Sequence, residues 1–192
     1  MQQTIRHDIS LLSEDDLYLF NEGRHLKIYA RLGAHPHQAD GVAGTYFATW
    51  APNAHLVSVV GHFNGWMPGA HPLAHRGQSG VWEGFIPGVG KGEIYKFHVE
   101  SRHHAYRADK ADPYGFWHEV PPRSGSVVWE LDYQWGDDEW MATRRAHNRL
   151  EAPISIYEIH LGSWRRNTEA DRPLTYRELA EPLAEHVTRL GF

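Results

Sequence analysis

Residues 44–66 read GTYFATWAPNAHLVSVVGHFNGW, and this stretch sets the expected fold of the chain. Thr45–Trp50 is rich in β-branched and aromatic residues and is followed by Pro and Asn, which is typical of a strand that ends in a turn. Leu56–Val60 is a second short apolar run. The bend Phe63-Asn64-Gly65-Trp66 then has the composition of a tight turn. The stretch therefore predicts two strands, each followed by a turn.

Further short strands are expected downstream, bounded by Gly- and Pro-rich segments: Val81–Ile86, Glu93–Val99 and Val127–Glu130. The second of these alternates strictly, because successive side chains of a strand point to opposite faces. One face then carries Tyr95, Phe97 and Val99, and the other carries Ile94, Lys96 and His98. Strands of this length and spacing predict a β-sandwich.

The segment before the strands is expected to be helical. Ser13 can cap a helix whose first turn is acidic, since carboxylates complement the helix dipole. A second short turn is expected at Ile28 and Tyr29, and Gly33 should end it before Pro36.

The last sixty residues have a different pattern. Glu139–Leu150 is expected to form a connecting helix, and Ile154–Leu161 is a continuous apolar run that suits a strand buried on both faces of a parallel sheet. Thr175 and Glu178 form a capping box for a final helix, in which Pro182 should cause a kink or a restart. One such strand and one helix cannot form a domain alone, so we expect this part either to dock on the sandwich or to belong to a longer chain.

Composition and charge exclude several classes of function. The net charge of −5 argues against nucleic acid or an anionic membrane as a partner. The absence of cysteine excludes a thiolate zinc site, and the fifteen histidines show no metal-ligand spacing, so neither a metal nor another cofactor is expected. The N-terminus has no signal-peptide pattern and no apolar run reaches the length of a membrane span, so a cytoplasmic location is the expectation. Aromatic residues make up 12%, with eight Trp and nine Tyr, which suits either a sugar-binding surface or simply a β-rich core.

Several motifs resemble a known family. LSEDDLYLFNEG at 12–23 and LGAHP at 32–36 resemble the approach segment of bacterial glycogen branching enzymes. The stretches GTYFATWAP and VGHFNGW resemble the family 48 carbohydrate-binding module that precedes the barrel of glycoside hydrolase family 13, and ADPYG at 111–115 resembles the link between the two. PISIYEIHLGSW at 153–164 is similar to the first barrel strand, and 176–192 to the first barrel helix.

The resemblance implies a fold and an activity. The implied fold is mainly β, an immunoglobulin-like β-sandwich followed by the first β–α unit of an incomplete (β/α)8 barrel. The expected segments are a helical approach at 1–36, the sandwich at 37–131, a connection at 132–152 and the barrel start at 153–192. The implied parent enzyme forms α-1,6 branches in glycogen by retaining glucanotransfer, on a carboxylate pair about 5–5.5 Å apart. The family places its catalytic carboxylates after the fourth, fifth and seventh barrel strands, so we expect no catalytic residue in this chain.

The same resemblance implies two carbohydrate-binding residues, Trp66 and Lys96. In glucan-binding relatives the tryptophan stacks on a sugar ring and the lysine donates hydrogen bonds to the sugar hydroxyls. The alternative for Trp66 is a hydrophobic plug at the sandwich edge, and the alternative for Lys96 is a solvated surface lysine. A second tryptophan follows the lysine in those relatives, whereas here residues 100–106 offer only Tyr106. Trp82 is expected in the core, and Glu158 is expected to have a structural role, since the family's catalytic acid comes much later.

The expected partners are α-glucans such as glycogen and amylose-type chains, together with the remainder of the catalytic barrel. We expect the chain to bind or orient glucan and to be inactive alone. Two alternatives stay open: a non-catalytic glucan-binding or scaffold module, and a trehalose-releasing or debranching relative of the same family.

Overall fold

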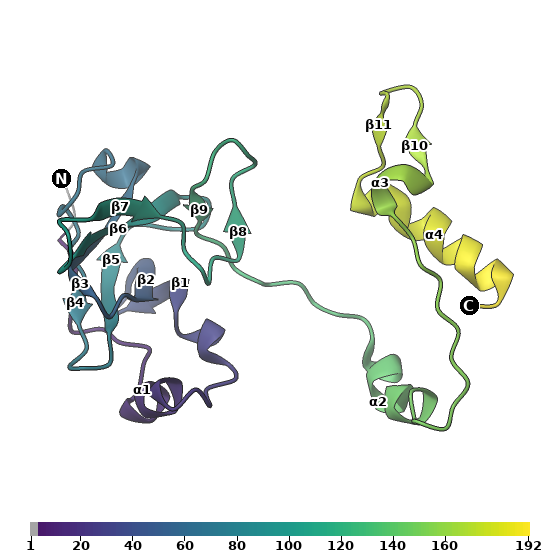
Figure 1. Cartoon of the computed structure of the whole chain (residues 1–192), viewed down its shortest axis with the longest axis horizontal. Coiled ribbons are helices and arrows are strands. Elements are labelled where there is room, and N and C mark those ends of the chain that lie inside the picture. Colours follow the sequence, from purple (N-terminus) through teal and green to yellow (C-terminus); the bar gives the residue numbers. More distant parts are fainter. Residues whose placement is uncertain (1–3) are drawn as a thin grey trace. The chain divides into compact units, whose positions relative to one another are not determined.

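The computed structural model describes residues 4–192, so the predictions for residues 1–3 lie outside the described part. The chain divides into two compact units, Met1–Tyr133 and Gln134–Phe192 (Figure 1). Each unit is described by itself.

The first unit is built on two antiparallel sheets. Sheet A has the order β1-β2-β5-β4, with strands Gly33–Ala39, Val42–Trp50, Val81–Pro87 and Ala74–His75. Sheet B has the order β3-β6-β9-β8, with strands Ala54–Gly61, Ile94–Ser101, Ser126–Val127 and Trp117–His118. A fifth strand of sheet B, β7 (Arg107–Lys110), pairs with the second half of β6. Four of the expected strands are present as β2, β3, β5 and β6, whereas the strand expected at Val127–Glu130 is limited to Ser126–Val127. The two antiparallel sheets agree with the predicted sandwich.

The core of this unit joins the two sheets. Phe47 and Ile86 of sheet A share one buried cluster with Val59, Tyr95 and Phe97 of sheet B. The alternation expected in β6 is therefore confirmed, since Tyr95 and Phe97 face the core. The opposite face of this sheet, which carries Ile94, Lys96 and His98, is called here the outer face of sheet B.

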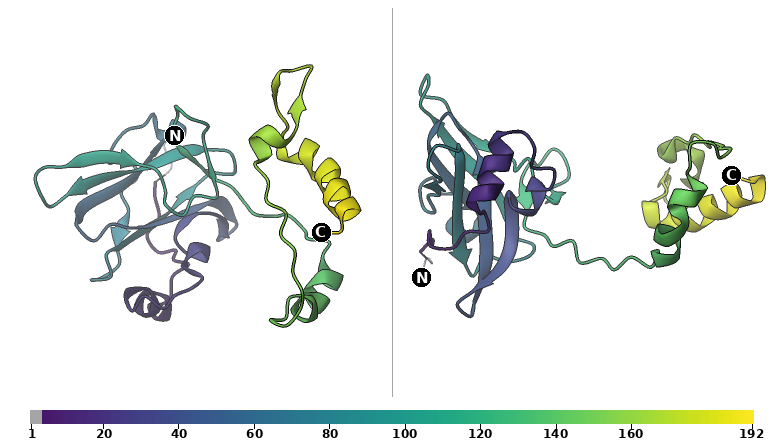
Figure 2. Two further views of the ribbon diagram at one scale, coloured as in Figure 1. Left: turned by 45° about the vertical axis from the view of Figure 1, so that its right-hand side comes forward. Right: turned by 90° about the horizontal axis from the view of Figure 1, so that it is seen from below.

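The N-terminal segment covers the other face of sheet A. Helix α1 (Glu14–Asn21) begins at the predicted cap, where Ser13 and Asp16 form a reciprocal capping box. A single turn, η1 (Ile28–Ala30), follows it as expected. Leucines of this segment form a second buried cluster with Tyr46 and Phe85, so that sheet A is buried on both faces. Figure 2 shows the ribbon of α1 beside the strands of this unit.

One strand of sheet A was not predicted from the sequence. Residues 33–36 were expected to end the helical approach, yet they begin β1, which pairs with β2 from Gly33↔Ala48 to Ala39↔Val42. Pro36 argued against a strand at this position, because proline has no backbone N–H to donate to a neighbouring strand. It is tolerated here since β1 is the edge strand of sheet A.

The second unit contains three helices and a two-stranded hairpin. These are α2 (Asp138–His147), α3 (Leu161–Trp164), β10 (Arg166–Asn167), β11 (Arg172–Pro173) and α4 (Tyr176–Leu190). The predicted capping box of Thr175 and Glu178 is confirmed, and Gly191 ends α4 in the left-handed conformation. Pro182 lies inside α4, which continues through it as one helix. No helix in the described range 4–192 is long and apolar enough to cross a membrane.

The strand expected at Ile154–Leu161 is not present in this structure. Residues 153–160 belong to no strand, and Ile154 and Ile156 are 74% and 79% exposed. A strand buried on both faces exists only when neighbouring strands take its backbone hydrogen bonds. The two-residue strands β10 and β11 pair with each other and form a separate two-stranded sheet, which does not include residues 154–161. The barrel start is therefore not present as a β–α unit.

A buried carboxylate fastens the N-terminal segment to the sandwich. Glu83 of β5 is 2% exposed and accepts hydrogen bonds from the Tyr46 hydroxyl, from Ser10 Oγ (2.9 Å) and from the Arg76 guanidinium (2.6 Å). Arg76 also pairs with Glu14 of α1 at 2.7 Å. The pKa of Arg76 is raised by its hydrogen bond to Glu83, and burial together with Glu83 raises that of Tyr46. Glu83 thus links Ser10, β2 and β5, and through Arg76 it is connected to α1.

This network gives a stability prediction. Replacing Glu83 with Ala should lower the free energy of unfolding by about 3–5 kcal/mol, because Arg76 and Tyr46 lose a buried acceptor. Tyr46→Phe removes a single hydrogen bond from the same carboxylate and should cost about 1 kcal/mol. Urea unfolding followed by circular dichroism compares the two variants. Equal losses in both would contradict a central role for Glu83.

Candidate functional site

The turn that carries Trp66 is fixed by a buried asparagine. It follows β3 as the single turn η2 (His62–Asn64). Asn64 Oδ1 accepts the Gly61 N–H at 2.9 Å, and Asn64 Nδ2 donates to the Val59 carbonyl at 2.8 Å. Gly65 then adopts a left-handed conformation with φ 62°, which glycine allows at no steric cost. The Asn-Gly pair therefore both forms the turn and anchors it to β3.

Trp66 is held in an unusual conformation. Its φ is 59°, in the left-handed region that bulky residues rarely adopt. Its N–H donates to the Gly61 carbonyl at 2.9 Å, and its indole, which is half-buried, meets the His62 ring edge-on with centroids 5.4 Å apart. The backbone strain has no evident structural purpose in the turn, since glycine would fit there without it.

Lys96 lies on the outer face of sheet B. It is directly opposite Val60 in the β3–β6 register, and Gly61 is opposite Tyr95. The Trp66 N–H is hydrogen-bonded to the Gly61 carbonyl. The structure therefore brings Trp66 and Lys96 to the same end of this strand pair. Lys96 Nζ donates to Ser124 Oγ at 2.8 Å, and its side chain is half-exposed. The ammonium group therefore has one neutral partner and keeps further donor capacity.

A buried polar network supports β6 from behind. The Asp112 carboxylate is 1% exposed and accepts from the Tyr95 hydroxyl and from the Tyr114 N–H. The Asp112 N–H donates in turn to Ser126 Oγ of β9 at 2.8 Å. Burial raises the pKa of Asp112 despite these donors. The ADPYG segment thus fixes β6 and β9 next to Lys96, a role that the sequence motif alone does not reveal.

Tyr106 does not join this site. It lies at the tip of the β6–β7 hairpin, where its carbonyl accepts the Ser101 N–H at 2.9 Å. Ser101 is five residues along β6 from Lys96, or about 17 Å at strand spacing. Tyr106 therefore cannot replace the second tryptophan of the glucan-binding relatives in contact with the same sugar.

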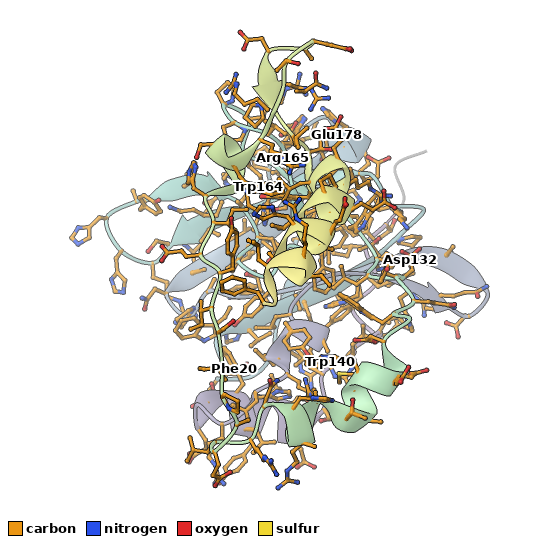
Figure 3. The ribbon with its side chains drawn as sticks, turned by 90° about the vertical axis from the view of Figure 1, so that its right-hand side faces the viewer. Phe20, Asp132, Trp140, Trp164, Arg165 and Glu178 are labelled. Atoms are coloured by element: carbon orange, nitrogen blue, oxygen red, sulfur yellow. The ribbon has the colours of Figure 1, made fainter. Side chains whose placement is uncertain are left out.

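The other candidate residues have structural partners. Trp82 is 7% exposed and belongs to the core, as expected. In the second unit, the Tyr157 hydroxyl lies 3.2 Å from His186 Nε2 of α4, and His160 Nδ1 lies 2.8 Å from Ser163 Oγ. Trp164 packs between the His186 ring and the Arg165 guanidinium beside α4 (Figure 3). Among residues 4–192, no group of three His, Asp or Glu side chains is placed to hold a metal ion.

Sequence reasoning missed a groove on sheet B. It has a volume of about 710 Å³ and lies between β8, β9 and the loop that joins them, lined by Gly92, Ile94, Trp117, His118, Glu119, Val120, Pro121, Pro122, Arg123 and Val127. The two-residue strands β8 and β9 are too short to give a periodic pattern, so only the Pro-Pro pair signalled a loop there. Trp117 is 49% exposed.

Comparison with known proteins finds a family that the first unit resembles. Residues 31–115 match the model of carbohydrate-binding module 48, also described as the isoamylase N-terminal domain. This range holds both Trp66 and Lys96, so both candidate residues lie in the part of the chain that is similar to this module.

Nearly the whole chain is also similar to several 1,4-alpha-glucan branching enzymes. It is 51% identical over 95% of its length to 1,4-alpha-glucan branching enzyme GlgB of Paramagnetospirillum magneticum, and 52% identical over 95% to that of Rubrobacter xylanophilus. With the GlgB of a Synechococcus strain it shares 47% identity over 96%. The chain spans about a quarter of the length of these relatives. It is homologous to the N-terminal part of the glycogen branching enzymes.

Solved structures overlap with the chain more loosely. A Klebsiella pneumoniae pullulanase complexed with maltotriose aligns with a TM-score of 0.43 and 24% identity, over 54% of this chain and 10% of that one.

The conformation of Trp66 gives a second prediction. Trp66→Gly and Trp66→Ala remove the same indole, but only alanine keeps a Cβ in the left-handed region. The glycine variant should therefore be more stable by about 1 kcal/mol. Urea unfolding of the two variants measures the difference. An alanine variant as stable as the glycine variant would show that the turn relaxes and holds no strain at this position.

Proposed function

We propose that the chain is the glucan-handling part of an enzyme that moves an α-1,4-linked glucan segment onto an α-1,6 position. The observation that carries this proposal is the identity of about half of the residues with branching enzymes over nearly the whole chain. The proposed partners are glycogen and amylose-type chains, which Trp66 and Lys96 would contact.

The chemistry of the site supports a neutral sugar. A glucose ring has an apolar C–H face and a rim of hydroxyls, so it pairs with a half-exposed indole and with hydrogen-bond donors. Trp66 offers the first and Lys96 the second, at one end of the β3–β6 pair. The bond from Lys96 to Ser124 joins it to a neutral hydroxyl, which a sugar hydroxyl can replace without leaving a buried charge unpaired. The strained backbone of Trp66 is the type of feature that persists where a side chain has a task.

The proposed organisation follows the homology. Residues 37–131 would form the immunoglobulin-like module, with 1–36 as its approach segment, and 132–152 would connect it to the first β–α unit of a (β/α)8 barrel at 153–192. In this proposal residues 154–161 become a strand only when neighbouring barrel strands pair with them. Catalysis would belong to the remainder of the barrel. The cytoplasmic location expected from the sequence stays a prediction.

A non-catalytic glucan-binding module is the second candidate. The match of residues 31–115 to a binding module favours it, since that match concerns binding and no chemistry. The two candidates agree on glucan contact and differ on the activity of the whole protein. Branching by the whole protein would decide for the first, and binding without branching for the second.

The binding claim gives a third prediction. In native gels that contain glycogen or amylopectin, the 192-residue chain should be retarded, and Trp66→Ala and Lys96→Ala should each weaken the retardation. The control is Trp140→Ala, which removes a tryptophan that is 49% exposed on α2 of the second unit (Figure 3). Wild-type mobility that polysaccharide leaves unchanged would reduce the module to a structural role.

A fourth prediction concerns chemistry. The 192-residue chain alone should leave the iodine absorption spectrum of amylose unchanged, because the family's catalytic carboxylates belong to later barrel strands. An active bacterial branching enzyme in the same assay is the positive control. A shift of the spectrum by this chain would place the transfer chemistry within these residues and overturn the proposed division of labour.

A further inference from the structure

The groove on sheet B has a three-strand apolar floor. In the strand register, Ile94 of β6 is opposite Val127 of β9, and Val127 is opposite Trp117 of β8. Directly opposite residues project from the same face of a sheet, so the three side chains form one row across it. Lys96 is two residues from Ile94 on the same strand, so it shares this face. The row therefore extends the outer face of sheet B away from Lys96.

The wall of the groove is the loop from Glu119 to Gly125. Glu119 Oε2 accepts the Gly125 N–H at 3.0 Å, which closes the loop on itself. A Cβ at Gly125 would come within 2.6 Å of Ile94 Cγ2 and 2.7 Å of Glu119 Oε2, so only glycine lets the loop lie this close to the floor. The groove is thus formed by specific packing between the loop and β6.

The electrostatics of the groove suit an uncharged ligand. Its acidic and basic side chains, Glu119 and Arg123, pair with each other at 3.7 Å. The Arg123 side chain is still 77% exposed, so it retains hydrogen-bond donors for a ligand. An apolar floor with a few polar groups at the rim, in a volume of about 710 Å³, is the usual composition of a small-molecule site.

Trp117 is held in place by its neighbours. Its ring meets the Trp129 ring edge-on, with centroids 4.4 Å apart, and the Lys91 ammonium lies 4.4 Å from the centroid of Trp129. A side chain that is oriented before binding loses little conformational entropy when a ligand stacks on it. Trp117 is therefore a rigid and half-exposed aromatic surface at the far end of the row.

The groove is continuous with the proposed sugar site. Ser124 belongs to the loop that forms the wall of the groove, and its hydroxyl accepts the hydrogen bond from Lys96. Trp117 lies two strands across and two residues along the sheet from Lys96, which is a separation of about 12 Å. An extended ligand can therefore contact Lys96 and the groove together.

We propose that the groove of Ile94, Val127 and Trp117 is a second glucan subsite, in which a glucosyl unit stacks on Trp117 and bonds Arg123 while another unit of the same chain contacts Lys96. This inference rests on the proposed glucan binding at Trp66 and Lys96. It extends that site along the sheet, and it gives the module a reason to prefer linear α-1,4 chains of several units over a single sugar.

The test is a titration of the 15N-labelled 192-residue chain with maltoheptaose, followed by NMR. The indole N–H signals of Trp66 and Trp117 report on the two subsites separately, and variants assign them. Both signals should shift with one affinity. Trp117→Ala should weaken binding roughly five- to tenfold, the loss expected for one aromatic stacking contact.

Two further variants keep the test independent of folding. Arg123→Ala alters an exposed side chain at the groove and should weaken binding several-fold, whereas Arg107→Ala alters an exposed arginine of β7 away from the groove and should have no effect. If the Trp66 signal shifts and the Trp117 signal does not, with Arg123→Ala binding as wild type, the second subsite is overturned and the proposed function stands. If maltoheptaose shifts neither signal, both are overturned.

Discussion

The buried carboxylate of Glu83 holds the N-terminal segment against sheet A. It accepts hydrogen bonds from Ser10, Tyr46 and Arg76, and Arg76 reaches on to α1. A charge with 2% exposure is tolerated only when it is paired and hydrogen-bonded. The N-terminal segment that completes this pairing also covers sheet A with its leucines. Sheet A is then a central layer, and the outer face of sheet B carries the candidate glucan contacts.

Sheet B uses a second buried polar group for a different purpose. Asp112 links Tyr95 of β6 to Ser126 of β9 across the inner side of the sheet. On the opposite face of the same strands lie Lys96 and the groove of Trp117. The Asp112 network on the inner face of sheet B thus positions the strands that carry the proposed ligand contacts on the outer face. Because both networks depend on buried hydrogen bonds, they set the register of the strands as well as their stability.

Sequence patterns predicted the strands that pack on both sides or alternate clearly, namely β2, β3, β5 and β6. They failed where local preference conflicts with tertiary pairing. Pro36 argues against a strand, yet an edge position removes the conflict and β1 forms. Ile154–Leu161 has the composition of a buried strand, yet it forms none without an adjacent edge. In both cases the neighbour in space, which a local pattern does not contain, decided the outcome.

The sequence by itself determined strands β2, β3, β5 and β6, the two helix caps at Ser13 and Thr175, the turn at Asn64-Gly65 and the resemblance that singled out Trp66 and Lys96. These features depend on residues close together in the chain, where spacing is sufficient. Only the tertiary structure decided that Trp66 and Lys96 share one end of a strand pair, that Tyr106 lies too far away to assist them, and that Trp117 continues their surface. These facts follow from strand register across residues far apart in sequence, and register is set by the whole core and its buried hydrogen bonds.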